Sequence, residues 1–311
     1  MTAARPEPVV VALAGVPSLG GLYARGVAGS VRPGRSRTVR SDDLPRTRLH
    51  VGGVSPDPAH LTDYQRLVGE TGSDVLPAGF VHVLAFPVAT ALMVRGEFPL
   101  PLLGMVHLAN HVEQRRPLTV TDELDIEVHA EGLAAHRSGV SVDLVATVRA
   151  DDDVAWVGRS TYLAKGYQLS DGDAADDDRP RESPDAPTAP PTADAPLAPT
   201  ARWRLAADTG RRYAAVSGDQ NPIHTNPLAA KAFGFPRAIA HGMYTAARAL
   251  AEVGPRARGE AFTWDVTFAK PVLLPSTVDV RIADDGAGHA FRVWSSRSGR
   301  THLEGAVRPL P

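Results

Sequence analysis

The chain has 311 residues, of which 43% are hydrophobic and 22% charged, so it is long enough for two ordinary domains that each bury a core. Its 33 basic and 35 acidic residues give a net charge of -2, and no Lys/Arg-rich run tracks a phosphate backbone, which argues against a nucleic-acid partner. The absence of cysteine excludes disulfides, thiolate nucleophiles and cysteine-based metal sites, and it suits the cytoplasm.

Residues 1–40 are predicted to form an N-terminal arm. The apolar stretch Val9–Val16 contains Gly15 and is far shorter than the roughly 20 residues of a membrane-spanning helix. It also lacks the preceding basic region of a signal peptide. We therefore expect this stretch to pack on the protein, without membrane insertion. The glycines and arginines that follow, as far as Arg40, indicate a loosely structured segment leading to the first strand.

Residues 41–168 are predicted to form a first half. A short helix is expected to end at Gly69, the usual left-handed terminator, and an apolar central helix to open at Ala85–Thr90. Alternating or apolar runs then predict strands. These runs are Leu124–Val128, Gly139–Arg149 and Val154–Ala164.

Residues 169–200 are predicted to be a disordered linker. From Ser170 to Thr200 the residues Asp, Ala, Pro, Ser and Thr replace almost every large apolar side chain. Such a segment cannot bury enough apolar surface to offset the entropy lost on ordering.

Residues 201–311 repeat the pattern of the first half. A short helix is expected to end at Gly218, and eight positions separate Pro271 from Asp279 just as they separate Pro117 from Asp125. An apolar helix at 246–253 and strands at 278–282, 290–295 and 302–307 complete the half. The order predicts an α+β fold in which each half wraps a curled antiparallel sheet around a long central helix.

The densest polar chemistry follows Gly218. Asp219, Asn221 and His224 fall within six residues of a turn that Pro222 stiffens. A carboxylate, an amide and an imidazole placed so closely can converge on one water molecule for general acid and base catalysis. We predict that Asp219 and His224 are catalytic and that Asn221 supports them. Ser217 is interpreted as a turn residue that supports the site through a hydrogen bond, because no GxSxG elbow surrounds it.

Gly242 is predicted to open the second central helix. The first N–H groups of a helix have no partner inside it and carry the positive end of its dipole. The Gly242 N–H could therefore hold a thioester carbonyl oxygen and stabilise an enolate.

The first half serves as an internal comparison. Aligning Gly69 with Gly218 places Glu70 opposite Asp219, and it places Gly72 and Val75 opposite Asn221 and His224. A second alignment places Pro87, which has no N–H, opposite Gly242. The first half is therefore expected to be a degenerate copy and the second half the catalytic one.

The segment from Tyr213 to Met243, YAAVSGDQNPIHTNPLAAKAFGFPRAIAHGM, resembles the hydratase signature of the MaoC-like family. The motifs GDxNPxH, AAxxFGF and AHGM occur in the family's order. The chain as a whole, from about Arg46 to Pro311 without the linker, resembles the double hot-dog dehydratases of mycobacteria and related actinobacteria, including FAKPVLLP in the second half and the stretch His107–Asp122 in the first.

This resemblance implies a pseudo-dimeric double hot-dog fold with Asp219 and His224 on the catalytic water, Asn221 in support and the Gly242 N–H on the thioester carbonyl. The implied activity is hydration of trans-2-enoyl thioesters, or dehydration of (R)-3-hydroxyacyl thioesters, of CoA or acyl carrier protein in fatty acid metabolism. No cofactor and no metal ion are expected. A homodimer of such fused halves is compatible with this organisation.

Other residues have a structural and a functional interpretation. His241 could contact substrate or cap the helix, and metal binding by His82, His107 and His111 is disfavoured. Four basic residues could meet CoA phosphates or an acidic carrier protein, although a solvated role is favoured. They are Arg115, Arg116, Arg237 and Lys270.

Two alternative functions remain open from the residues alone. A thioesterase is possible because the hot-dog fold serves both activities. A non-catalytic acyl-binding subunit is a second alternative, which the presence of Asp219, Asn221 and His224 weighs against.

Overall fold

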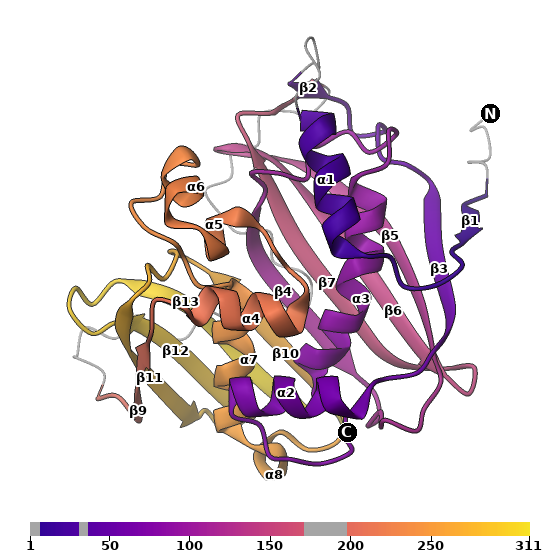
Figure 1. Ribbon diagram of the computed structural model, residues 1–311. Coiled ribbons are helices and arrows are strands. Elements are labelled where there is room, and N and C mark those ends of the chain that lie inside the picture. The colour runs from indigo at the N-terminus through magenta and orange to yellow at the C-terminus, as the bar shows by residue number, and fades with distance from the viewer. Residues whose placement is uncertain (1–6, 31–36, 171–197) are drawn as a thin grey trace.

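The computed structural model describes residues 7–30, 37–170 and 198–311 and contains one 11-stranded sheet with helices packed on it (Figure 1). Most of the predicted linker, residues 171–197, lies outside the described residues. No helix among the residues that the structure describes is long and apolar enough to span a membrane.

The first half contains five strands of the sheet and two helices, the long one buried against the strands. In chain order these are β3 (Thr47–Val54), α2 (Pro58–Val68), α3 (Ala78–Met93), β4 (Val106–Gln114), β5 (Leu124–His136), β6 (Gly139–Ala150) and β7 (Asp153–Lys165). The three strands predicted after the central helix are thus confirmed.

The second half repeats this order and adds short helices. Its elements are β9 (Ala201–Leu205), α4 (Thr209–Ser217), α5 (Pro222–Thr225), α6 (Pro227–Ala232), α7 (Gly242–Val253), α8 (Pro255–Arg258), β10 (Phe262–Phe268), β11 (Ser276–Asp284), β12 (His289–Ser295) and β13 (Thr301–Pro309). Its predicted strands are confirmed as well.

The strand order shows that the two halves are equivalent. The first half runs β3-β5-β6-β7-β4, and the second continues as β10-β13-β12-β11-β9, which is the same order reversed. The antiparallel pair β4 and β10 joins them at the centre. Each half therefore wraps its own strands around its own helix, α3 or α7, and the fold is the predicted α+β double hot-dog.

Local sequence explains the ends of the paired helices α2 and α4. Gly69 and Gly218 follow them with φ of 83° and 71°, and each N–H closes the last turn on a carbonyl four residues back. Glycine adopts this left-handed conformation without strain, so both helices stop where the sequence predicted.

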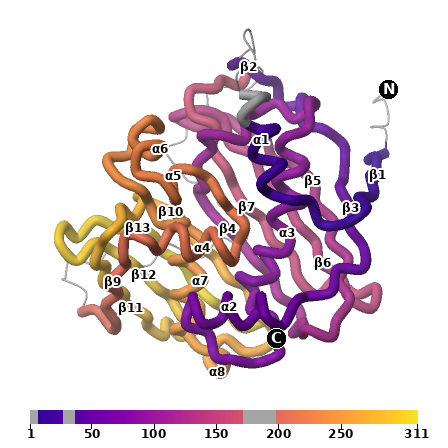
Figure 2. The backbone as a smooth tube through the Cα atoms, viewed as in Figure 1, coloured from indigo at the N-terminus to yellow at the C-terminus, as the bar shows by residue number. Residues whose placement is uncertain are grey.

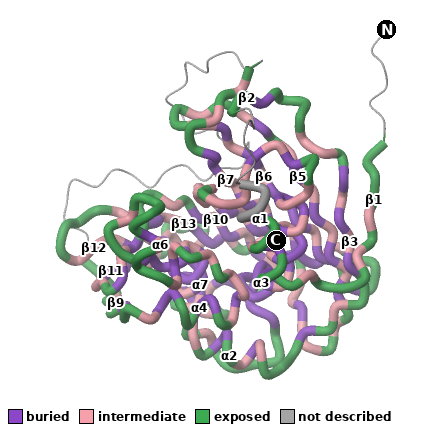
Figure 3. Tube along the Cα trace, turned by 45° about the horizontal axis from the view of Figure 1, so that its top comes forward, coloured by how far each residue is buried: buried purple, intermediate pink, exposed green. Residues whose placement is uncertain are grey.

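The core lies between the sheet and the two central helices. Twelve of the 16 residues of α3 are buried, so this helix is apolar on every side, whereas α7 buries eight of its 12 residues and exposes Glu252. Figure 3 shows the buried residues concentrated in α3, α7 and the strands behind them, and the exposed ones on the loops and the outer edges. A helix apolar all round is typical of the centre of a fold.

The N-terminal arm departs from its prediction in part. The apolar stretch packs on the protein as expected, since Val9–Ala12 form strand β1, which pairs in parallel with β3. The segment expected to be loosely structured instead begins with helix α1 (Leu19–Ser30), and its residues 31–36 lie outside the described residues. Figure 2 shows the arm returning from the sheet edge across α3 toward the middle of the molecule. Four glycines in α1 lower its intrinsic helix propensity, so packing rather than propensity explains the helix. Further along, β2 (Thr38–Val39) pairs with β8 (Gln168–Leu169).

The alignment of Pro87 with Gly242 is wrong. Helix α3 begins at Ala78, nine residues before Pro87, which lies inside it. In the first half the N–H of Leu76 donates to the carbonyl oxygen of Leu118. In the second half the N–H of Ala240 donates to the carbonyl oxygen of Val272 in the same way. Two isolated bridges continue the match, between Val75 and Thr119 and between Ile239 and Leu273. The structural counterpart of Gly242 is therefore Ala78, and that of His241 is Pro77.

The alignment of Gly72 and Val75 with Asn221 and His224 fails for a related reason. Eight positions separate Gly69 from Pro77, but 23 separate Gly218 from His241. The additional residues include α5 and α6, which have no counterpart in the described part of the first half.

Candidate active site

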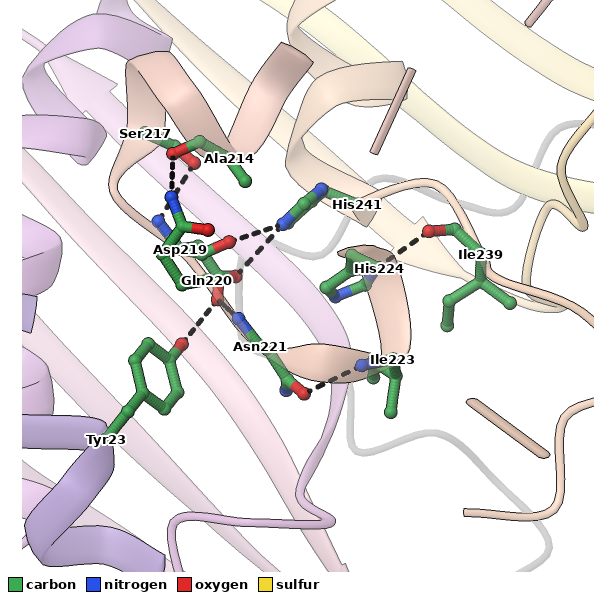
Figure 4. A network of polar contacts seen from close by, with 10 residues as sticks. All are labelled: Tyr23, Ala214, Ser217, Asp219, Gln220, Asn221, Ile223, His224, Ile239 and His241. Atoms are coloured by element: carbon green, nitrogen blue, oxygen red, sulfur yellow. Dashed lines mark hydrogen bonds and ion pairs between the residues drawn. The ribbon is translucent and has the colours of Figure 1, made fainter. Parts of the chain in front are cut away.

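The turn after α4 holds the first predicted residues (Figure 4). The Asp219 N–H donates to Ser217 Oγ at 3.2 Å, and the Asn221 N–H donates to Asp219 Oδ1 at 3.1 Å. Asn221 Oδ1 in turn accepts from the N–H of Ile223 at 3.3 Å and caps α5. Ser217 and Asn221 thus shape the backbone around the Asp219 carboxylate.

His224 lies on the one-turn helix α5 and is 9% exposed. Its Nδ1 lies 2.9 Å from the carbonyl oxygen of Ile239, which can only accept, so Nδ1 carries the proton. Nε2 is then the unprotonated nitrogen of the neutral ring, and the described residues provide it with no hydrogen-bond partner. The folded chain therefore fixes a tautomer that can accept a proton.

His241 is a third member of the site that the sequence left undecided. Its ring stacks on His224 with centroids 3.7 Å apart. Its Nε2 donates to the Asp219 carbonyl oxygen at 3.0 Å and lies 3.6 Å from Asp219 Oδ2. His241 directly precedes α7, yet its side chain makes no capping hydrogen bond. It connects the helix start to the Asp219 turn instead.

Tyr23 is a site residue that the sequence did not suggest. Its hydroxyl donates to Asp219 Oδ1, and Figure 4 shows its ring pointing from α1 toward the turn. The two residues are 196 positions apart in the chain. No local motif surrounds Tyr23 in the glycine-rich arm, so only the tertiary structure brings it to the site.

The charges of the site follow from burial and neighbours. Burial alone would raise the pKa of Asp219, but His241, His224, and the hydrogen bonds from Tyr23 and Asn221 together hold it below its ordinary value. Burial lowers the pKa of His224 and brings that of His241 to about 3, although the negative charge of Asp219 acts to raise both pKa values. At neutral pH both imidazoles are neutral, and the hydrogen bonds from Tyr23 and Asn221 then keep the Asp219 carboxylate ionised.

Gly242 is the first residue of α7, as predicted. The described residues supply no hydrogen-bond acceptor to its N–H, which leaves this donor free at the positive end of the helix. A Cβ at this position would lie 2.9 Å from Phe268 Cε1. Glycine thus lets the Phe268 ring close over the helix start.

The first half contributes a wall of aromatic rings beside Asp219. His107 stacks on Tyr162 with centroids 4.5 Å apart and lies 4.9 Å from Phe268. His82 lies next to His107, with ring centroids 6.4 Å apart, and the negative charge of Asp219 acts to raise the pKa of His82, His107 and Tyr162. Burial lowers the pKa of His82 to about 4 and that of His107 to about 3, so both are neutral.

A small cavity of about 10 Å³, room for roughly one water molecule, continues from this wall into the first half. It lies between α3 and the strands β5, β6 and β7. His82 and Tyr162 line it, and the charge of Asp219 acts to raise the pKa of both. Its remaining lining is mostly apolar, with Trp156 against Gly158. The central helix of the first half therefore serves as core and as cavity wall.

One group of residues in the described part of the chain could hold a metal ion. Asp219, His224 and His241 each offer one ligand atom, and these atoms lie within 4.8 Å of one another. The disfavoured trio His82, His107 and His111 does not form such a group among the described residues, and His111 instead contacts Asp265 across the central strand pair at 2.7 Å.

The basic residues considered for CoA phosphates have mostly structural partners. Arg115 pairs with Glu113 at 2.7 Å, and Arg116 donates to the carbonyl oxygen of Ala150 at 2.8 Å. Arg237 donates to the Pro275 carbonyl at 3.3 Å, whereas Lys270 is exposed.

Comparison with known proteins identifies relatives of this chain. Residues 179–305 match the model of the MaoC like domain. The chain is 39% identical over 272 residues to 3-hydroxyacyl-thioester dehydratase X of Mycobacterium tuberculosis, which covers 87% of this chain and 92% of that protein. It is 34% identical over 73 residues to 3-hydroxybutyryl-CoA dehydratase of Methylorubrum extorquens, which covers 22% of this chain and 46% of that protein.

Solved structures agree with these matches. The crystal structure of HtdX of Mycobacterium tuberculosis superposes with a TM-score of 0.72 at 37% identity, covering 85% of this chain and 100% of that one. A MaoC-like dehydratase from Phytophthora capsici has a TM-score of 0.68 at 18% identity and covers 88% of this chain and 98% of that one. The second match supports the fold alone.

Proposed function

Because the chain belongs to the MaoC-like dehydratase family, we propose that it interconverts (R)-3-hydroxyacyl and trans-2-enoyl thioesters in fatty acid metabolism, with Asp219 and His224 as its catalytic residues. One observation supports the choice of these two residues. Asp219 is an ionised carboxylate, and His224 is a neutral imidazole whose unprotonated nitrogen is Nε2. Both residues contact His241, which directly precedes Gly242 and its free N–H.

In the hydration direction, we place the reacting water between Asp219 and His224 Nε2. As the water oxygen bonds to the β-carbon, His224 Nε2 takes one of its protons, and the electrons of the C=C bond move to form the enolate of the thioester. The Gly242 N–H donates to the enolate oxygen, and the helix dipole adds to this stabilisation. The imidazolium then returns its proton to the α-carbon. Dehydration is the reverse.

Asp219 has a different role in this mechanism. Its low pKa keeps it ionised, so it accepts a hydrogen bond from the water and stabilises the imidazolium while His224 carries the extra proton. Asn221 and Ser217 support it by holding the turn. Proton transfer between these groups needs no metal ion or redox cofactor.

The acyl chain is proposed to lie between α3 and strands β5 to β7, where the lining side chains move to widen the cavity of about 10 Å³. Its lining is apolar apart from a few polar groups near the reacting atoms, which is the usual composition of a ligand pocket. The thioester could be carried by CoA or by acyl carrier protein, and the exposed Lys270 is a candidate contact for either carrier.

The domain boundaries are proposed as in the sequence analysis, with an arm at 1–40, a supporting half at 41–168, a linker at 169–200 and a catalytic half at 201–311. Residue Tyr23 extends the catalytic site into the arm. We further propose a cytoplasmic location, which the cysteine-free composition suits, and association of the fused halves into a homodimer.

A direct assay tests this function. Purified protein is mixed with crotonyl-CoA and with a 12-carbon trans-2-enoyl-CoA while the enoyl absorbance and free thiol are followed. Loss of absorbance with (R)-3-hydroxyacyl product and no thiol is the expected result. Release of thiol would favour a thioesterase, and no change with CoA or carrier-protein substrates would favour a non-catalytic subunit.

A further inference from the structure

Helix α1 of the N-terminal arm is packed into the molecule. Leu19 and Leu22 are buried, at 8% and 1% exposure, and a Cβ on Gly26 would lie 2.9 Å from Leu102 Cδ2. Figures 1 and 2 both show α1 lying along α3 with one end near the turn that follows α4. The arm is therefore continuous with the core and not an external extension.

Two side chains of α1 contact consecutive residues of the catalytic turn. Leu19 and Tyr23 are four positions apart, so they project from the same face of the helix on adjacent turns. Leu19 Cδ1 lies 2.7 Å from where a Cβ on Gly218 would be, so the leucine packs directly on that glycine. Tyr23 donates its hydroxyl proton to Asp219 Oδ1.

The two carboxylate oxygens of Asp219 consequently differ. Oδ1 accepts from Tyr23 and from the Asn221 N–H, whereas Oδ2 faces His241 at 3.6 Å, beyond hydrogen-bond range. Two donors on one oxygen fix the carboxylate plane. Oδ2 is left to accept from a ligand.

We propose that helix α1 completes the active site and that Tyr23 is a positioning residue, which holds Asp219 Oδ1 so that Oδ2 faces the reacting water. The role of Oδ2 toward water rests on the proposed function, whereas the Tyr23 contact does not. Burial, and then the Asp219 charge, raise the pKa of Tyr23, so its hydroxyl is protonated and remains a donor at neutral pH. Tyr23 acts through Asp219 and takes no part in proton transfer.

The test compares Tyr23→Phe with Tyr64→Phe in the full chain. Tyr64 is a matched control because its hydroxyl is fully buried but has no hydrogen-bond partner among the described residues. In Tyr23→Phe we expect kcat for crotonyl-CoA hydration to fall roughly ten- to a hundredfold with KM changed less than about twofold, as for loss of one hydrogen bond to a charged group. Tyr64→Phe should retain the kcat of the unmodified chain.

A second readout does not depend on activity. The Asp219 carboxyl is titrated by NMR in protein labelled with 13C-aspartate, and its signal is identified by its loss in Asp219→Asn. Because the Tyr23 hydrogen bond stabilises the charged form, Tyr23→Phe should raise the pKa of Asp219, and Tyr64→Phe should not.

The outcomes separate the two proposals. An inactive wild-type chain would refute the function, but a raised Asp219 pKa in Tyr23→Phe would still support the contact. If folded Tyr23→Phe retains both the wild-type Asp219 pKa and the wild-type kcat, the positioning role is wrong.

Discussion

The imidazole rings of His224 and His241 lie stacked, with centroids 3.7 Å apart and planes inclined by 25°. Each ring donates one N–H to a backbone carbonyl, that of Ile239 or that of Asp219. A charge on His224 opposes a charge on His241, and both rings are buried, so the pair is neutral in the resting site. The neutral pair determines how activity depends on pH.

Activity should fall on acidification. The proposed base, His224, works in its neutral form, and burial lowers its pKa below the ordinary value of 6.5. Its protonated fraction is therefore small at about pH 7 and grows only as the pH falls below about 6.5. We expect kcat for crotonyl-CoA to be constant between about pH 7 and about pH 8 and to decline below that range. A kcat that rises as the pH falls through 6.5 would contradict the assignment of His224 as base.

Replacing either proposed catalytic side chain should abolish turnover without unfolding the chain. Asp219→Asn keeps the shape of the side chain but removes its charge, and His224→Ala removes the base. A general base typically contributes about 10²- to 10⁴-fold, so we expect losses of that size in kcat. Asp63→Asn on the exposed face of α2 is the control for removing one carboxylate. Near-normal turnover in either folded variant would rule out the mechanism.

Gly242→Ala should lower activity because the added Cβ would lie 2.9 Å from the Phe268 ring. The ring or the start of α7 must move, which displaces the N–H that is proposed to hold the thioester oxygen. We expect kcat to fall at least about tenfold, as for a damaged oxyanion site. Gly72→Ala, where a Cβ meets nothing within 4 Å, is the matched control. Adding Phe268→Leu to Gly242→Ala should restore part of the activity, and no rescue would mean that the clash is not the cause.

Breaking the ion pair between the halves should destabilise the fold. Arg258 donates to both oxygens of Glu70, at 2.8 and 3.2 Å, and their side chains are only 10% and 4% exposed. Arg258→Met leaves a buried carboxylate unpaired and should lower the free energy of unfolding by about 3 to 5 kcal/mol.

The double variant Glu70→Gln/Arg258→Met should recover much of this loss, because neither charge then remains buried. Arg95→Met breaks an exposed pair with Glu97 and should cost less than about 1 kcal/mol. Urea unfolding of the four proteins measures each value. If Arg258→Met and Arg95→Met lower the free energy of unfolding equally, the pair between Arg258 and Glu70 is not buried in solution.

Trp156 should limit the length of the acyl chain. Its ring is fully buried at the cavity and lies against Gly158, whose Cβ position is 2.1 Å from Trp156 Cη2. Trp156→Leu opens this end of the cavity and should raise kcat/KM for 12-carbon relative to 4-carbon enoyl-CoA. Trp264 is equally buried but does not line the cavity, so Trp264→Leu should leave the ratio unchanged. A ratio that does not differ between the two variants would place the acyl chain elsewhere.

Much of the fold could be predicted from the sequence, because the patterns that indicate its helices and strands depend on neighbouring residues. The alternation in Leu124–Val128 and the terminators Gly69 and Gly218 depend on residues next to one another in the chain, so periodicity and backbone preference reveal them. The start of α3 could not be placed in this way. Pro87 looks like a helix opening but lies inside α3, and the register came only from the Leu76 and Ala240 hydrogen bonds.

For the site, the sequence by itself brought the proposed catalytic groups together, since Asp219, Asn221 and His224 are held by one short turn whose hydrogen bonds span two or three residues. Only the tertiary structure decided what surrounds them. The tautomer of His224 depends on Ile239, the orientation of Asp219 on Tyr23, and the wall beside them on His107 and Tyr162 of the other half. These contacts join residues that lie far apart along the chain, and they form only when the sheet and its two central helices have packed.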